Sequence, residues 1–369
     1  MVALCVLSVL SLCGCWDYIS LNELAVVAGI SIDFEKESQS YIMNFEIVDT
    51  QASSTENGVE TKIIDSQGQT MFEAVTNAKT KLDSRIYFGV TQVIVLSRQV
   101  IQSCGINRVI DFFLRVSEAR ETVYLAVSEE ETAAAVLQTE YTDNVIISHE
   151  IAAIIGKDNK VTLSTVKMPL YEAYNILNRE GKTLTLPLLK KGENNRKPCA
   201  QVDGMVAVDK NKIYGKLSPK RARYFLFVID AVEGGTIDFS NEGNIDALST
   251  EIKSSDTRYS FSTADDGVDY TIKLDIDVFL HELMTKDGEK ITIGQAEEII
   301  ENFVSKQIAG VIDYAQNELK TDIFGFGQHI YRHDSKKWDG LMNNWDLHFS
   351  QMEVRVEPRV TIINTEMTK

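Results

Sequence analysis

Hydrophobic and polar positions alternate every second residue over several stretches of the chain, which is the pattern of half-buried β-strands. Residues 24–33 and 41–48 are two such stretches, and the charged sequence "FEKESQS" between them predicts a hairpin. A helical spacing follows, because Thr70 and Glu73 form a capping box ahead of an amphipathic segment. The apolar face predicted for this helix consists of Phe72, Val75, Ala78 and Leu82.

Strand and helix patterns keep alternating along residues 15–190, which favours an α+β or α/β sheet domain. Within it, "TLTLPLL" predicts an edge strand, because Pro187 has no N–H to donate to a neighbouring strand. Residues 191–199 are polar and contain Gly and Pro, so a linker is predicted there. A strand-rich middle domain at 200–250 and a C-terminal domain at 251–369 follow.

The C-terminal domain is predicted to contain one long amphipathic helix over residues 293–319. A single strand over residues 352–363 is predicted to close the fold. The apolar side of the long helix is formed by Ile299, Ile300, Phe303, Val304, Ile308, Val311, Ile312, Ala315 and Leu319.

The first fifteen residues carry no charged side chain, and their apolar run has the length of a signal-peptide core. The run ends in Leu12-Cys13-Gly14-Cys15, which resembles the lipobox of bacterial lipoproteins. We therefore predict a signal peptide at residues 1–14, cleavage between Gly14 and Cys15, and an S-diacylglycerol and N-acyl anchor on Cys15. The alternative is a buried strand or helix in which Cys13 and Cys15 pack as small apolar residues.

Charge changes the picture of possible partners. The chain has 54 acidic and 37 basic residues, a net charge of -17, which repels nucleic-acid phosphates and anionic lipid headgroups. Nucleic acid is therefore excluded as the expected partner, and attachment to a membrane would need a covalent or apolar anchor. The 44% of hydrophobic residues are ordinary for a folded protein.

The sequence contains no pattern that predicts catalysis, a metal or a cofactor. After cleavage at Cys15, only Cys104 and Cys199 remain besides it, either as free thiols or as one disulfide. His329 and His333 have the i, i+4 spacing of two metal ligands, but no third ligand has a matching spacing, so a solvated or core-edge helix face is favoured. Gly325-Phe326-Gly327 lacks the third glycine of a phosphate-binding loop. We therefore predict a protein that is not an enzyme.

Aromatic residues gather near the C-terminus, and they have two interpretations. Trp338 and Trp345 are candidates for a partner interface, since Trp is enriched among interface anchors. The alternative, which their seven-residue spacing favours, is that both lie on one helix face in the core of the last domain. Trp16 and Asp17, just past the anchor, are a further candidate for a partner interface, and an indole there also suits the lipid headgroup layer.

Several separated blocks together resemble the Ger(x)C family, the lipoprotein C subunits of spore germinant receptors. The resemblance runs from Cys15 to the C-terminus in the same order as in the family. Its blocks are "CGCWDYISLNELAVVAGISID", "SRIYFGVTQVIVLS", "GINRVIDFFLR", "VDGMVAVDKNKIYGKLS" and "DIFGFGQHIYRHDSKKWDGLMNNWDLHFSQMEVRVEPRVTI".

The resemblance implies an α+β protein of three domains, each a mixed or antiparallel sheet packed with helices. It implies a non-enzymatic subunit that is anchored by lipid on the outer face of the spore inner membrane. There it would work with a membrane-spanning A subunit and a permease-like B subunit of a nutrient germinant receptor. The alternative function is a lipid-anchored protein that itself binds a small nutrient.

Overall fold

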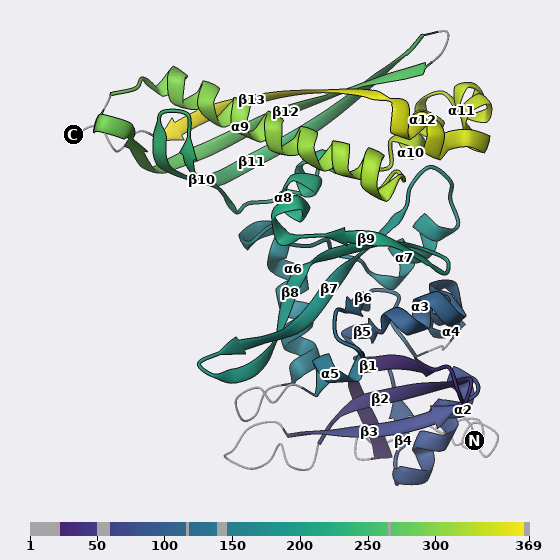
Figure 1. The fold of residues 1–369 in the computed structure, drawn as a ribbon. Coiled ribbons are helices and arrows are strands. Elements are labelled where there is room, and N and C mark those ends of the chain that lie inside the picture. The colour runs from purple at the N-terminus through teal and green to yellow at the C-terminus, as the bar shows by residue number, and fades with distance from the viewer. Residues whose placement is uncertain are drawn as a thin grey trace, which may run out of the picture.

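The computed structural model of the chain describes residues 23–49, 60–115, 118–138, 146–264, 267–288 and 290–364 (Figure 1). These residues form two β-sheets with helices packed against both, which confirms the α+β class. Within these ranges no helix is both long and apolar enough to cross a membrane. The predicted signal peptide lies outside the described residues.

The first sheet has the strand order β3-β2-β1-β5-β6-β7-β8-β9, with β4 beside the start of β1. Strands β1, β5, β6 and β7 are parallel to one another, and the outer strands β2, β3, β8 and β9 are antiparallel to their neighbours. The strands are β1 Leu24–Glu35, β2 Ser40–Val48, β3 Thr61–Gly68, β4 Arg85–Tyr87, β5 Val93–Leu96, β6 Tyr124–Ser128, β7 Leu184–Asn194, β8 Lys197–Asp209 and β9 Lys212–Leu217.

Helices cover both faces of the parallel part of this sheet, which explains why β5, Val93–Leu96, is apolar and buried at every position. Along β5, Ile94 and Leu96 pack into one core with α3, α4 and α7, whereas Val93 and Val95 pack into the other with α5 and α6. The helices are α2 Met71–Ala78, α3 Arg98–Cys104, α4 Ile106–Arg115, α5 Ala134–Leu137, α6 Ile147–Val161 and α7 Leu170–Leu177, with a 3-10 turn, η3, at Lys79–Lys81.

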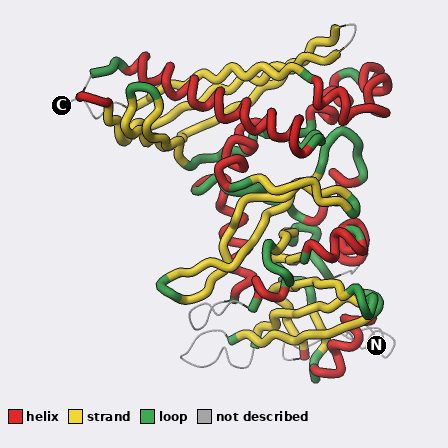
Figure 2. Tube along the Cα trace, viewed as in Figure 1, coloured by secondary structure: helices red, strands yellow, loops and turns green. Residues whose placement is uncertain are grey.

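The linker predicted at residues 191–199 is instead the outer end of the β7–β8 hairpin. Asn195 and Arg196 have φ angles of 51° and 65°, so they form the two-residue left-handed turn that suits a hairpin. The polar composition that suggested a linker reflects strands that run out beyond the sheet into solvent, as Figure 2 shows.

The prediction that the strand containing Pro187 lies at an edge is also wrong. β7 lies between β6 and β8, but its pairing with β6 begins only at Leu188. Its register with β8 shifts between Pro187 and Leu189. The missing N–H is therefore tolerated because Pro187 precedes the paired stretch and lies next to a β-bulge.

The second sheet has the order β10-β11-β12-β13, with β12 and β13 parallel. Its strands are β10 Thr236–Glu242, β11 Ile245–Ala264, β12 Gly267–Thr285 and β13 Glu353–Asn364. The accompanying helices are α8 Pro219–Val228, α9 Ile293–Tyr314, α10 Phe326–His333, α11 Ser335–Leu341 and α12 Trp345–Gln351, with 3-10 turns η4 Lys286–Gly288 and η6 Met342–Asn344. A π-helical turn, η5 Ala315–Leu319, extends α9 over the range expected for the long helix.

Residues 200–250, expected to be a separate middle domain, divide between the two sheets. β8 and β9 complete the first sheet, α8 connects the sheets, and β10 begins the second sheet. The boundaries at 15–190 and 251–369 and the number of domains stay predictions. In the structure, hydrogen-bonded strands run across residue 190 without interruption.

Helix α9 lies along the outer edge of β13 and satisfies the backbone groups of that strand. Thr292 and Gln295 form a capping box at its start. Farther along, Glu301 accepts a hydrogen bond of 2.8 Å from the N–H of Val360, and Glu297 accepts one of 2.9 Å from the N–H of Ile362. Because the two glutamates are four residues apart, they lie on one face of the helix and meet alternate residues of the strand.

Candidate functional site

The predicted lipidation and cleavage residues, Gly14 and Cys15, lie outside the described residues, as do Trp16 and Asp17. The first described strand begins at Leu24, nine residues beyond Cys15. The candidate sites within the described residues are therefore the aromatic block, the histidine pair and the charged clusters of the two sheets.

The two C-terminal tryptophans are buried and are not exposed interface anchors. Trp338 is 4% exposed and Trp345 is 7% exposed. They lie on different helices, α11 and α12, because the turn η6 interrupts the single helix that their spacing suggested. Their rings are edge to face with centroids 5.2 Å apart. The structure thus supports the core interpretation and corrects the proposal that these side chains form a partner surface.

A buried carboxylate, Asp322, lies beside Trp345. It is 1% exposed and accepts a hydrogen bond of 3.2 Å from the indole Nε1–H. Three backbone N–H groups also donate to it, from Phe324 at 3.0 Å, Gly325 at 2.8 Å and Gly327 at 2.9 Å. Burial raises the pKa of this carboxyl to about 6, although the four donors oppose that shift.

Residues 322–327, which we call the Asp322 loop, join the two halves of the molecule, namely the half built on the first sheet and the half built on the second sheet. The backbone carbonyl of Asp322 accepts a 2.7 Å hydrogen bond from Thr183 N–H, and Gln328 N–H donates to the carbonyl of Gly181 over 3.1 Å. Gly181 has a φ of 80°, and a Cβ there would lie 2.7 Å from the carbonyl carbon of Gly327. Only glycine permits this approach without displacing the Asp322 loop.

A hollow of about 780 Å³ opens at this junction, between residues 176–183 and the helices α11 and α12. Arg179, Tyr214 and Asp346 are among its lining residues, so it is polar and carries charges of both signs. Burial lowers the pKa of Lys182 in its wall, with Glu172 and Asp322 acting in the opposite direction. The volume falls within the range of small-ligand sites.

The histidine pair is on α10, with the two ring centroids 4.2 Å apart. Nδ1 of His329 is 2.5 Å from the hydroxyl of Tyr270, and Nδ1 of His333 bonds the backbone carbonyl of His329 at 2.9 Å. Burial, followed by the positive charges of His333 and Arg332, lowers the pKa of His329 to about 4. Among the described residues, no group of three or more His, Cys, Asp or Glu side chains is arranged to hold a metal ion.

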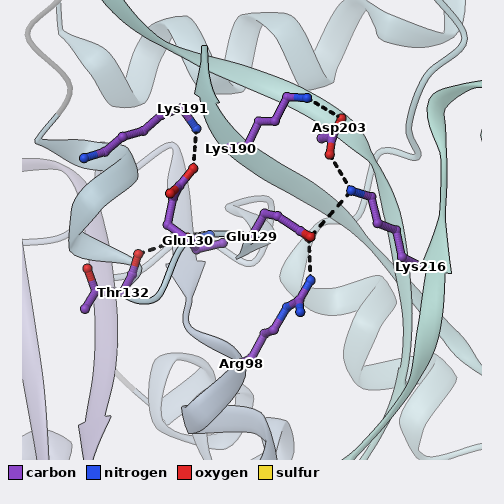
Figure 3. Close-up of polar contacts among 9 residues, drawn as sticks. Arg98, Glu129, Glu130, Thr132, Lys190, Lys191, Asp203 and Lys216 are labelled. Atoms are coloured by element: carbon purple, nitrogen blue, oxygen red, sulfur yellow. Dashed lines mark hydrogen bonds and ion pairs between the residues drawn. The ribbon is translucent and has the colours of Figure 1, made fainter.

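A third polar cluster lies where the parallel strands end, and Figure 3 shows it as a chain of ion pairs. Glu129, which follows β6, pairs with Arg98, which follows β5. Glu129 also pairs with Lys216 of β9 at 3.5 Å, and Lys216 pairs with Asp203 of β8. Lys190 of β7 completes the chain, 2.8 Å from Asp203.

This cluster positions strands, because each of its charged groups is paired with another member of the cluster. Partial burial raises the pKa of Asp203, but hydrogen bonds from Lys190 and Lys216 outweigh that effect and lower it overall. Three cations and two carboxylates alternate across strands that come from distant parts of the sequence. The arrangement holds the β7–β8–β9 extension against the parallel strands of the sheet.

Sequence reasoning missed Asp322 although its signal was present. An Asp shortly before Gly325-Phe326-Gly327 is typical of a turn in which a carboxylate accepts from following N–H groups. The glycines were tested only as a cradle for an external phosphate. In the structure the N–H groups of Gly325 and Gly327 do donate to a carboxylate, but it is the side chain of Asp322 and not an external phosphate. The ion-pair chain had no local signal, because its members are long-range neighbours.

Cys104 and Cys199, the two cysteines within the described residues, are both free thiols. Cys104 is buried at the end of α3, and Cys199 in β8 is partly exposed. Burial raises the pKa of the Cys104 thiol, so it behaves as a core residue.

Comparisons with known proteins cover both halves of the chain. Residues 17–191 match the family described as "Spore germination protein N-terminal domain", and residues 203–366 match "Spore germination B3/GerAC like, C-terminal". In Bacillus subtilis, "Spore germination protein B3" is 24% identical over 96% of this chain and 95% of its own, and "Spore germination protein A3" is 25% identical over 96% and 94%. The crystal structure of the GerBC protein is similar in fold, with a TM-score of 0.59 and 21% identity over 91% of this chain and 97% of its own.

We predict that Asp322→Ala strongly destabilises the protein, because it removes the acceptor of four buried donors. The expected loss in free energy of unfolding is about 3 kcal/mol. Urea unfolding followed by tryptophan fluorescence measures it, since Trp338 and Trp345 lie beside the site. The control is Asp334→Asn, which keeps an N-cap side chain on α11 and should change the value little. Equal effects of the two changes would contradict the role of Asp322.

We also predict that His329 makes the protein sensitive to acid. Its folded pKa of about 4 lies below the ordinary value of 6.5, so between these values the unfolded chain binds a proton that the native chain does not. The contribution of His329 to stability is therefore lost as the pH drops through this window, whereas Asp322, whose folded pKa is raised to about 6, contributes in the opposite direction. Relative to the native sequence, His329→Gln should therefore lose less free energy of unfolding as the pH falls from about 6.5 to about 4. A curve for His329→Gln parallel to that of the native sequence would refute this.

Proposed function

Because the chain belongs to the Ger(x)C family of spore germination proteins, we propose that it is a lipid-anchored, non-enzymatic subunit of a nutrient germinant receptor. It triggers spore germination through contacts with membrane-spanning A and B subunits. The observation that carries the proposal is that both family domains are present in order and the chain spans nearly the whole length of its relatives. Acylated Cys15 would hold the protein on the outer face of the spore inner membrane.

The interior of the described residues supports a role other than catalysis. Two strongly perturbed groups, Asp322 and His329, are engaged with donors and acceptors of the protein itself. The ion pairs at the carboxyl ends of the parallel strands likewise pair with one another. Such groups fix the shape of a scaffold, and a rigid shape is what a subunit needs to transmit a signal through protein contacts.

A second candidate function is direct binding of a small nutrient, and the hollow at the junction of the two sheets favours it. Its volume of about 780 Å³ would accommodate an amino acid or a sugar, and its wall offers both an ammonium, Lys182, and a carboxylate, Asp346. Against it, the hollow is open and polar, with little apolar surface to exclude water from a ligand.

We expect Cys15→Ala to release the protein from the membrane and to abolish or strongly slow nutrient germination when made in the native host. Two or three acyl chains hold a protein firmly, at about 0.8 kcal/mol per buried methylene, and this change removes all of them. Fractionation, incorporation of labelled lipid and germination assays measure the outcome. The matched control is Cys13→Ala, which alters only the segment predicted to be cleaved off. A Cys15→Ala protein that stays in the membrane fraction and incorporates lipid would overturn the anchor.

The two candidate functions differ in their thermal behaviour. A nutrient-binding protein gains stability with ligand concentration by mass action, about 2.7 kcal/mol at one hundred times Kd. We predict no shift in melting temperature with amino acids or sugars, together with co-purification of the membrane-spanning subunits. A saturable shift that Asp346→Asn or Lys182→Met removes would instead establish the hollow as a nutrient site.

A further inference from the structure

Phe72 is the most exposed large apolar side chain among the described residues, at 72% of its surface. The sequence pattern placed it on the apolar face of its helix, and the structure shows that this is wrong. The buried positions of α2 are Met71, Ala74, Val75 and Ala78, which pack against the first sheet. Phe72 therefore points away from the sheet and toward solvent.

The exposed positions of α2 are Phe72, Glu73, Thr76 and Asn77, and Lys79 of η3 follows them. Phe72, Thr76 and Lys79 are four and then three residues apart, so they share one side, which we call the α2 outer face. Lys79 is exposed and forms no ion pair with the part of the chain that the structure describes, unlike Lys81, which pairs with Asp65. A phenylalanine ring can enter the boundary between headgroups and acyl chains, and a lysine on the same side of the helix can reach the headgroups.

The α2 outer face lies at the end of the molecule where the chain enters from its predicted anchor. η3 follows α2 directly and leads into β4, and Arg85 of β4 is paired with Leu24, the first residue of β1. Leu24 is the ninth residue after Cys15, and nine residues span at most about 32 Å. Figure 1 shows α2 and β4 at the end of the molecule farthest from the β10–β13 sheet.

We propose that the α2 outer face is a second membrane contact, in which Phe72 enters the interfacial layer of the phospholipid bilayer and Lys79 reaches the headgroup phosphates. The inference rests on the lipid anchor at Cys15 proposed above. Phe72 alone could not hold a protein of net charge -17 at a bilayer. The lipid anchor, however, keeps the α2 outer face at a high effective concentration next to the bilayer. The contact therefore sets orientation, with the second sheet directed away from the membrane.

The test uses the full acylated chain in vesicles of phosphatidylcholine and phosphatidylglycerol whose acyl chains are brominated, since bromine quenches nearby tryptophan. Trp16→Phe removes the tryptophan next to the anchor, and Trp338 and Trp345 are buried in the distant half. Phe72→Trp then reports on the α2 outer face. The matched control is Leu347→Trp on α12, an exposed apolar position in the second half of the molecule.

We expect bromine to quench the tryptophan at position 72, whose emission shifts to the blue because its indole leaves water for the bilayer, and to leave the tryptophan at position 347 unquenched. Vesicle flotation is measured on the same samples. Flotation with no more quenching at 72 than at 347 would overturn the membrane contact while leaving the anchor intact. Failure of the unmodified chain to float would overturn the anchor, and this inference with it.

Discussion

The buried carboxylate of Asp322 is the interaction on which the arrangement of the two halves depends. An isolated charge in the interior would cost several kcal/mol, and this one is tolerated because four donors converge on it. Those donors bend residues 322–327 into a tight turn. The same turn presents its backbone to Gly181 and Thr183 of the first half and receives the indole of Trp345 from the second. The junction hollow lies where these elements meet.

The sequence was informative wherever local structure is decided by residues that are close together in the sequence. The long helix over residues 293–319 was readable from its apolar stripe. Thr70 caps its helix as predicted by accepting from Glu73 N–H, but the Glu73 carboxylate accepts from Gln69 N–H and so does not complete the capping box. Residues 191–199 were misread, because a hairpin that projects into solvent has the same polar composition as a linker. Phe72 was assigned to the wrong face of its helix, because the sequence does not distinguish an exposed apolar residue from the buried apolar residues next to it.

The candidate sites also differ in whether they depend on residues close in the sequence or on residues brought together by the fold. A lipobox is a linear signal, read by enzymes as an extended peptide, so it can be recognised from sequence even though Cys15 lies outside the described residues. The charges of Arg98, Glu129 and Asp203 become neighbours only when separate strands join one sheet. Trp338 and Trp345 were assigned to one helix because the helical spacing of apolar residues continues across η6. That spacing gives no indication that η6 separates two helices.

The glutamates of α9 that occupy the edge of β13 restrict how this protein can assemble. Unpaired strand edges are templates on which other chains add strands, and proteins crowded together on a surface meet one another constantly. Because Glu297 and Glu301 already bond the N–H groups of Ile362 and Val360, this part of the edge cannot recruit a strand from a neighbouring molecule. Contacts made at this edge must therefore form between side chains, which can be specific and reversible where a continuous sheet would be neither.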